Sequence, residues 1–199
     1  MWLTRLQIEG FRSLRKVLID LDDLTVLIGE NDAGKSSVLD ILAICLSGSR
    51  PDSTDFYRDE QGQTAREVLA TLEFALDEDD DEARNVAAAN LLKVSYTFLA
   101  DGSLTRKYYA EVPVDERFDQ DFSKLNAADQ RRLLQELAPD ISADQINNSE
   151  KRLDKFSALR DAAPKTSKWL EAPLRWGDFL PRFERYSSMD YNTPESMIA

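Results

Sequence analysis

Residues 25–46, TVLIGENDAGKSSVLDILAICL, constrain the fold more than any other part of the sequence. The stretch begins with an apolar run that ends at Gly29, passes through a loop with two glycines, and continues into a second apolar run. The first run has the character of a strand buried on both faces, and the segment from Gly34 to Leu46 has the length of a helix that Gly48 can end. The sequence therefore predicts a strand, a glycine-rich loop and a helix in succession, within an α/β fold.

The loop matches the phosphate-binding pattern G-x-x-x-x-G-K-[ST]. In this pattern the glycines let successive backbone N–H groups turn toward a β-phosphate, and the following helix adds its positive N-terminal end. Lys35 is expected to reach the β- and γ-phosphates, and the Ser36 hydroxyl to ligate Mg²⁺. The residues predicted to bind the nucleotide are Gly29, Glu30, Asn31, Asp32, Ala33, Gly34, Lys35, Ser36 and Ser37. A glycine-rich turn that only caps a helix is the alternative interpretation.

Composition excludes several classes of function. The 199 residues contain no histidine, which rules out Ser-His and Cys-His catalysis and histidine-ligated zinc. The formal net charge of −12 argues against a general polyanion-binding surface, which needs clustered Lys and Arg. Cys45 is the single cysteine and lies in an apolar run, so we expect a small core residue and no disulfide.

No apolar run approaches the about 20 residues that a membrane helix needs, and the N-terminus lacks the pattern of a signal peptide. The sequence therefore predicts a cytoplasmic location and no membrane partner.

The sequence predicts a P-loop lobe with a mixed sheet around one long helix, and apolar periodicity predicts an antiparallel subsheet. Residues 2–8 and 17–19 have the pattern of a hairpin, and residues 68–76 place alternate apolar side chains on one face. The stretch VSYTFLADGSLTRKYYAEVPV reads as two strands around a turn at Asp101 and Gly102.

Between these strands, DEDDDEARNVAAANLL predicts a helix with an acidic start. We interpret the acid run as a solvated face, and a cation site is the sharper alternative.

Helical patterns follow from about residue 119. Asn126-x-x-Asp129 and Ser142-x-x-Gln145 resemble capping boxes, with Pro139 between the two segments and Pro164 after the second. The predicted organisation is a lobe with an antiparallel subsheet over residues 1–118, a helical insertion over 119–163, and a segment over 164–199 that returns to the lobe.

A family resemblance lies in LTRLQIEGFRSLRKVLIDLDDLTVLIGENDAGKSSVLDIL. This stretch resembles the N-terminus of the ABC-type ATPase heads of RecF and SMC proteins and, most closely, of the OLD (overcoming lysogenization defect) family of ATP-dependent nucleases. The I-x-G-F-R-S strand, the hairpin and LIGENDAGKSS carry it, and DFYRDE, TLEFAL and YSSMDYNTPESMI have a weaker OLD-like character. The Asn-Lys-x-Asp signature of GTPases is absent.

The resemblance implies ATP and Mg²⁺ as ligands, and it nominates two further site residues. In such heads the Arg of the FRS element tends to lie near the nucleotide, which points to Arg12; a surface arginine at a strand end is the alternative. The heads also carry a polar residue, usually Gln, on a strand where it touches Mg²⁺ and the attacking water. Glu73 stands at the comparable place, either as a metal ligand or as an ordinary strand residue.

Two parts of an ABC-type head are not evident in the sequence. LSGS at residues 46–49 mimics the signature motif but directly follows the first helix, so we interpret it as a helix C-cap. YTFLAD offers Asp101 as a Walker B aspartate, but Gly102 stands where the catalytic Glu belongs.

We therefore expect the N-terminal piece of a larger ATPase, whose hydrolysis needs a second copy or the remainder of the head. The resemblance implies DNA as a partner of the parent protein, in repair or phage defence, with a Toprim nuclease domain after the ATPase. DNA binding by this chain itself is expected to be weak or absent, and nothing in these residues shows nuclease chemistry. A non-catalytic nucleotide-binding module is the alternative function, and a self-sufficient P-loop kinase is a third.

Overall fold

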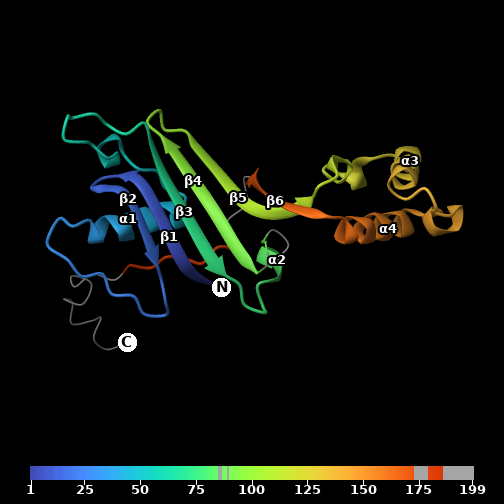
Figure 1. Cartoon of the computed structure of the whole chain (residues 1–199), viewed down its shortest axis with the longest axis horizontal. Helices are drawn as coiled ribbons and strands as arrows, with labels where there is room; N and C mark the ends of the chain where they lie inside the picture. The colour runs from blue at the N-terminus through green and yellow to red at the C-terminus, as the bar shows by residue number, and fades with distance from the viewer. Residues whose placement is uncertain (85–86, 89, 173–178, 186–199) are drawn as a thin grey trace, which may run out of the picture. The chain divides into compact units, whose positions relative to one another are not determined.

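The computed structural model describes residues 1–84, 87–88, 90–172 and 179–185 of the chain (Figure 1). It divides into two compact units, which we call the sheet unit (Met1–Ala110 and Trp169–Ala199) and the helical unit (Glu111–Lys168). The predicted helical insertion, residues 119–163, falls within the helical unit. The predicted motif YSSMDYNTPESMI, residues 186–198, lies outside the described residues.

A six-stranded sheet with the order β2-β1-β3-β4-β5-β6 forms the framework. Its strands are β1 (Trp2–Phe11), β2 (Leu14–Asp20), β3 (Glu67–Ala75), β4 (Leu91–Leu99), β5 (Leu104–Pro113) and β6 (Lys165–Glu171). Neighbouring strands from β2 to β5 pair antiparallel. The hairpin predicted near the N-terminus and the hairpin around Asp101 and Gly102 are both confirmed, whereas β6 was not predicted.

Helix α1 (Lys35–Ser47) covers one face of this sheet, and it lies behind the strands in Figure 1. Its buried residues Val38, Ile41, Leu42 and Cys45 share a core with Leu6, Ile8, Val68, Ala70, Leu72 and Phe74 of the strands. The alternation predicted for residues 68–76 is therefore confirmed. The Cys45 thiol is a buried core group as predicted, and its burial raises its pKa.

Gly48 ends α1 in a left-handed conformation with φ 74°. Glycine adopts this conformation without the steric penalty that a β-carbon would bring. The interpretation of LSGS as a helix C-cap is confirmed.

The prediction of a strand before the loop is wrong. Residues 25–30 have no regular secondary structure, and Leu24, Val26 and Ile28 expose 84%, 68% and 90% of their surface. A strand buried on both faces needs a hydrogen-bonded neighbour and a packed layer on each side. No strand in the described ranges pairs with this segment, so its apolar side chains stay in solvent.

The acid-rich helix is far shorter than predicted. Helix α2 spans only Asp81–Arg84, Asn90 lies in a turn, and β4 begins at Leu91. The N-terminal ammonium group pairs with Asp77 and Asp80, at 2.8 Å from each carboxylate. Among the described residues no group of three or more acidic or cysteine side chains is arranged to hold a metal ion, so the cation-site alternative gains no support.

In the helical unit, α3 (Ala127–Leu137) and α4 (Ser149–Ala162) begin at side-chain caps. Asn126 Oδ1 accepts hydrogen bonds from the N–H groups of Ala128 and Asp129, both at 3.0 Å. The predicted box at Ser142 and Gln145 is present, but it caps the short 3₁₀ helix η4 (Ala143–Ile146).

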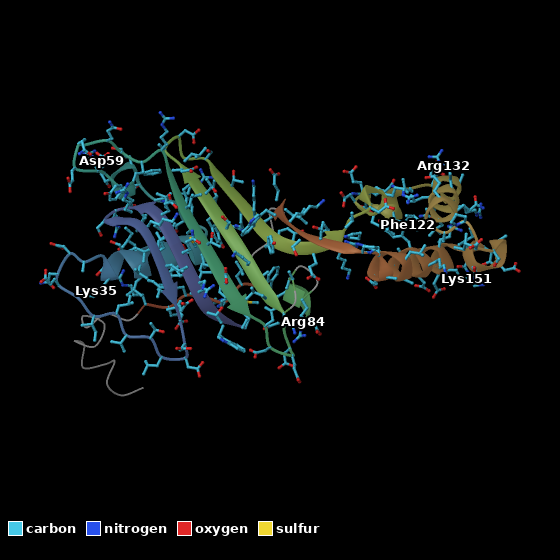
Figure 2. All side chains as sticks on the ribbon, viewed as in Figure 1. Lys35, Asp59, Arg84, Phe122, Arg132 and Lys151 are labelled. Carbon is cyan, nitrogen blue, oxygen red and sulfur yellow. The ribbon has the colours of Figure 1, made fainter. Side chains whose placement is uncertain are left out.

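A second core fills this unit, from Phe118, Phe122, Leu133, Leu134, Ile146 and Phe156. Phe122, labelled in Figure 2, stacks on Phe156 with ring centroids 4.2 Å apart. The remaining short helices are η1 (Ser53–Asp55), η2 (Glu116–Phe118) and η3 (Phe122–Lys124). None of the helices in the described ranges combines the length and apolar content that a membrane span requires.

Candidate phosphate-binding site

The glycine-rich loop packs closely against the turn between β1 and β2. Gly34 has φ 88°, and a β-carbon there would lie 2.6 Å from Leu14 Cδ2 and 2.9 Å from Ser13 Oγ. Both the left-handed backbone and the close approach require glycine. The second glycine of the motif therefore fixes the loop against the hairpin at the point where α1 begins.

Helix α1 starts directly after Gly34, and no side chain caps its first turn. The first turn also carries no acidic residue. The first N–H groups of a helix lack intrahelical partners and carry the positive end of the helix dipole. An anion at this end of α1 would meet unopposed donors.

The Lys35 ammonium group folds back over the loop. Its Nζ donates to the carbonyl oxygens of Gly29 and Glu30, at 2.8 and 2.5 Å. A phosphate would draw this cation away from two neutral acceptors toward charged oxygens, which form stronger hydrogen bonds with an ammonium group.

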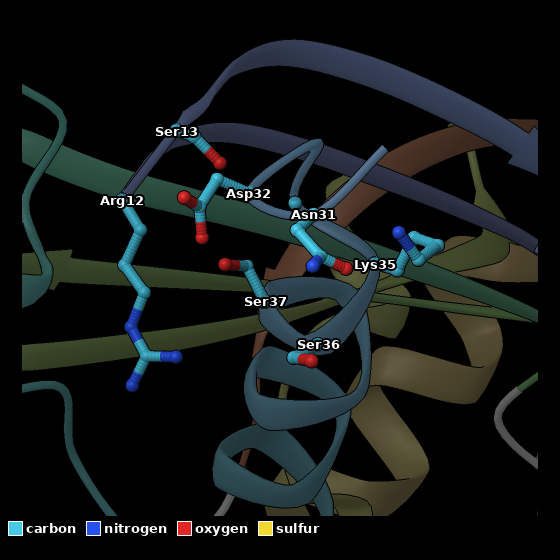
Figure 3. Close-up of a pocket in the computed structure, with 8 residues that line it drawn as sticks. Arg12, Ser13, Asn31, Asp32, Lys35, Ser36 and Ser37 are labelled. Carbon is cyan, nitrogen blue, oxygen red and sulfur yellow. The ribbon is translucent and has the colours of Figure 1, made fainter. Parts of the chain in front are cut away.

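A pocket of about 640 Å³ opens at this place (Figure 3). Its lining residues are Arg12, Ser13, Asn31, Asp32, Gly34, Lys35, Ser36 and Ser37. Figure 3 shows Asp32 and Ser37 between Arg12 on one side and Lys35 on the other.

The pocket thus brings together Arg12 and six of the nine residues predicted from the loop. Gly29 and Glu30 contribute the carbonyls that hold Lys35, and Ala33 faces a smaller apolar pocket next to β2. Ser13 was missed, although it directly follows Arg12 in the FRS element.

Arg12 occupies the two-residue turn between β1 and β2 with φ 47°, which is uncommon for a residue with a side chain. Its N–H donates to the Asp55 carbonyl at 2.6 Å, and its Nε donates to Asp55 Oδ1 at 2.7 Å. Its Nη1 donates to Asp40 Oδ2. The hydrogen bond with Asp55 is the largest cause that raises the pKa of Arg12.

Asp40 and Asp55 are site residues that the sequence did not predict. Asp55 lies in η1, where its Oδ2 also accepts from the N–H of Asp52 at 2.8 Å. Asp40 lies on α1, and its Oδ1 accepts a hydrogen bond from Nη1 of Arg185. Neither contact could be read from local sequence, since both carboxylates are remote from Arg12 along the chain.

A comparison with protein families matches most of the chain. The model of the AAA ATPase domain family matches residues 1–171, which include the loop, the hairpin and all described strands. The chain belongs to the AAA ATPase domain family.

A curated relative of this ATPase domain is "Uncharacterized protein YbjD" of Escherichia coli (strain K12). The two are 45% identical over 60 residues, which cover 30% of this chain and 11% of that protein. The match therefore spans a small part of the relative's length.

Solved SMC heads also resemble the ATPase domain. A structure described as showing ATP-driven dimerization and DNA-stimulated activation of SMC ATPases shares 20% identity at a TM-score of 0.46, over 54% of this chain and 69% of that chain. An SMC head bound to the C-winged helix domain of ScpA shares 16% sequence identity at a TM-score of 0.44, over 81% of this chain and 56% of that chain. The SMC head domain from Thermotoga maritima shares 22% sequence identity at a TM-score of 0.41, over 54% of this chain and 37% of that chain.

Glu73 of the ATPase domain lies away from the pocket. Its neighbours Leu72 and Phe74 point into the core under α1, so alternation along β3 directs Glu73 to the opposite face of the sheet. There its Oε1 lies 2.5 Å from Lys93 Nζ, and its Oε2 lies 4.0 Å from Arg5 Nη1. The structure does not bring Glu73 together with Ser36.

Asp101 sits in the hairpin turn between β4 and β5, where its Oδ1 accepts from the Ser103 N–H at 2.8 Å. Hydrogen bonds from Ser103 hold the pKa of this carboxyl below its usual value. The interpretation of this stretch as a hairpin is confirmed, because β4 and β5 pair antiparallel on either side of the turn, and the Walker B alternative gains no support.

The pocket residues fit a nucleotide with a magnesium ion. Lys35 supplies a cation, Ser36 an exposed hydroxyl at the start of α1, and Gly34 a cradle that a β-carbon would obstruct. Mg²⁺ prefers oxygen ligands and keeps several waters, so one protein hydroxyl together with phosphate oxygens is a suitable ligand set.

Proposed function

We propose that this pocket binds ATP with Mg²⁺. The observation that carries the proposal is the fit of Gly34 against Ser13 and Leu14, because it holds the start of α1, Lys35 and Ser36 at one pocket. Lys35 neutralises charge on the β- and γ-phosphates, the first N–H groups of α1 bind phosphate oxygens, and Ser36 ligates the metal ion.

The proposed role of the chain is the nucleotide-binding part of an ABC-type ATPase head from an OLD-like protein. Arg12 supports this role, since it lies in the pocket as the resemblance implies. The water-positioning groups would come from a second copy or from further parts of the head. In the parent protein the ATPase would act on DNA, in repair or phage defence.

A non-catalytic nucleotide-binding module is the alternative. It is favoured by the position of Glu73, which pairs with Lys93 rather than facing Ser36. Turnover measured with the remaining parts of the head supplied would separate the two roles, because only an ATPase head gains hydrolysis from them.

The contribution of Mg²⁺ tests the proposal through Ser36. Calorimetry on the wild-type chain should show tighter binding of ATP with Mg²⁺ than with a chelator, because the metal ion bridges phosphate oxygens and the Ser36 hydroxyl. In Ser36→Ala the two affinities should converge. Ser95→Ala, on the sheet face away from α1, is the matched control and should keep the wild-type difference.

The opposite pattern would reject this site for the metal ion. If Ser36→Ala kept the full advantage of Mg²⁺, the ion would be held by other groups and the assignment of Ser36 would be wrong.

A further inference from the structure

Arg12 is held in a backbone conformation that usually belongs to glycine. It lies at the first position of a two-residue hairpin turn, with φ 47°. An arginine at this position is strained, and such strain persists only when surrounding contacts fix it. The 2.6 Å hydrogen bond from the Arg12 N–H to the Asp55 carbonyl is one of these contacts.

Two carboxylates hold the guanidinium group of Arg12 by different nitrogens. Asp55 accepts from Nε, and Asp40 accepts from Nη1. The guanidinium carbon also lies 5.1 Å from the centroid of the Phe11 ring. Within the described part of the chain Nη2 donates no hydrogen bond, so the side chain is fixed while the donors of one nitrogen stay available to a ligand.

Asp40 reaches Arg12 from the helix that begins at the loop. It stands four residues after Ser36, which places both on the same side of α1. The Asp40 side chain is only 22% exposed. One regular helical turn sets the distance of Asp40 from the loop. Asp40 can therefore fix the guanidinium group of Arg12 relative to Lys35 and Ser36.

The second oxygen of Asp40 has a partner of its own. Its Oδ1 accepts from Arg185, which follows Phe179, Leu180 and Phe183 in a segment that packs against the sheet core. The two arginines and the two aspartates of this network balance in charge. The acids that orient Arg12 are therefore neutralised within the network itself.

We propose that Asp40 is a positioning residue of the nucleotide site, and that Arg185 supports it. Asp40 does not touch the nucleotide; it orients the Arg12 guanidinium group toward the phosphates. This inference rests on the proposed binding of ATP, and it adds a role for two residues outside the loop.

A double-mutant cycle separates positioning from simple charge. Asp40→Asn keeps the shape of the side chain and removes its charge, so ATP affinity with Mg²⁺ should fall at least threefold when Arg12 is present. In an Arg12→Ala background the same substitution should cause no fall, because there is no guanidinium group to orient. Asp20→Asn, whose 70% exposed carboxylate pairs with Arg5, is the control and should leave affinity unchanged.

Equal effects of Asp40→Asn in both backgrounds would overturn the proposal, since they would show a general electrostatic or structural role. If Asp40→Asn does not fold, Arg185→Gln provides the same test without altering α1. It should weaken ATP binding only when Arg12 is present, and no change in either background would contradict the inference. A wild-type chain that binds no ATP would instead refute the proposed function itself.

Discussion

A β-carbon on Gly34 would lie only 2.6 Å from Leu14 Cδ2, so the phosphate-binding loop and the first hairpin fit together without room for a side chain. The contact joins residues from two separate sequence motifs, the FRS hairpin and the loop. Their close fit makes the hairpin part of the pocket.

Substitution of Gly34 should therefore damage both stability and binding. We expect Gly34→Ala to lower the free energy of unfolding by about 1–3 kcal/mol, through the positive φ and the contact with Leu14, and to weaken ATP binding at least tenfold. Gly48→Ala is the matched control, because Gly48 also has a positive φ but a β-carbon there would meet nothing within 4 Å. It should cost about 1 kcal/mol and leave ATP binding intact. Urea denaturation and calorimetry measure both effects, and equal ATP affinity in Gly34→Ala and Gly48→Ala would contradict the account.

The exposed apolar segment before the loop should contribute little to the stability of this chain. Ile28 is 90% exposed, so Ile28→Ser should change the free energy of unfolding by less than about 0.5 kcal/mol. Leu72 is fully buried in the core under α1, and Leu72→Ala should cost about 2–5 kcal/mol. Similar losses in the two variants, measured by urea denaturation, would show that residues 25–28 are packed in solution.

The elements around the loop show which parts of the fold the sequence can predict and which it cannot. The alternation of apolar residues correctly predicted the buried face of β3, and Gly48 after an apolar run correctly predicted the end of α1. Both signals are local in the sequence. The run from Leu24 to Ile28 signals a need for burial, but burial depends on a neighbouring strand that no local pattern supplies. The short extent of α2 has a similar cause, since Ala88 forms a β-bridge with Leu91 and Asn90 lies in the turn before β4, contacts that no local pattern supplies.

The site was predictable to the extent that its residues are adjacent in sequence. The loop pattern located Lys35, Ser36 and their neighbours, and the resemblance added Arg12. The partners of this arginine were missed because they lie far along the chain: Asp40 is 28 residues from it and Asp55 is 43. Arg185 is 145 residues from Asp40, and only the fold brings the two together.

We expect the ion pair between Glu73 and Lys93 to stabilise the fold and to play no part in ATP binding. The Glu73 side chain is 12% exposed and that of Lys93 is 32% exposed, so Glu73→Gln should lower stability by about 1–2 kcal/mol through the loss of a largely buried pair. ATP affinity with Mg²⁺ should stay within about twofold of wild type, a change worth less than about 0.5 kcal/mol. Glu9→Gln, which alters a more exposed pair with Lys16, controls for loss of charge on the sheet. Loss of the Mg²⁺-dependent part of ATP binding in Glu73→Gln would show that the carboxylate reaches the metal ion.

The chain alone should bind ATP but hydrolyse it negligibly. Phosphoryl transfer needs groups that position water and stabilise charge on the γ-phosphate, and a single such group can change the rate by about 10³–10⁵. Asp101 lies in a turn and Glu73 on the far face of the sheet, so neither supplies these functions at the pocket. Steady-state assays, with Lys35→Ala as the control for contaminating enzymes, should give the same background rate for both proteins. Robust turnover that disappears in Lys35→Ala would mean that a complete catalytic site exists in these residues.

ATP binding by wild type and Lys35→Ala tests the central claim most directly. Removing the ammonium group leaves the start of α1 intact but deletes a charge-assisted contact with the phosphates, so affinity should fall by about 1.5–3 kcal/mol, roughly 10- to 150-fold. Lys124→Ala, whose side chain is 82% exposed in the helical unit, should bind as wild type does. Calorimetry that finds tight binding in wild type and Lys124→Ala and weak binding in Lys35→Ala is the predicted result; equal ATP affinity in all three proteins would contradict the assignment of this pocket as a phosphate site.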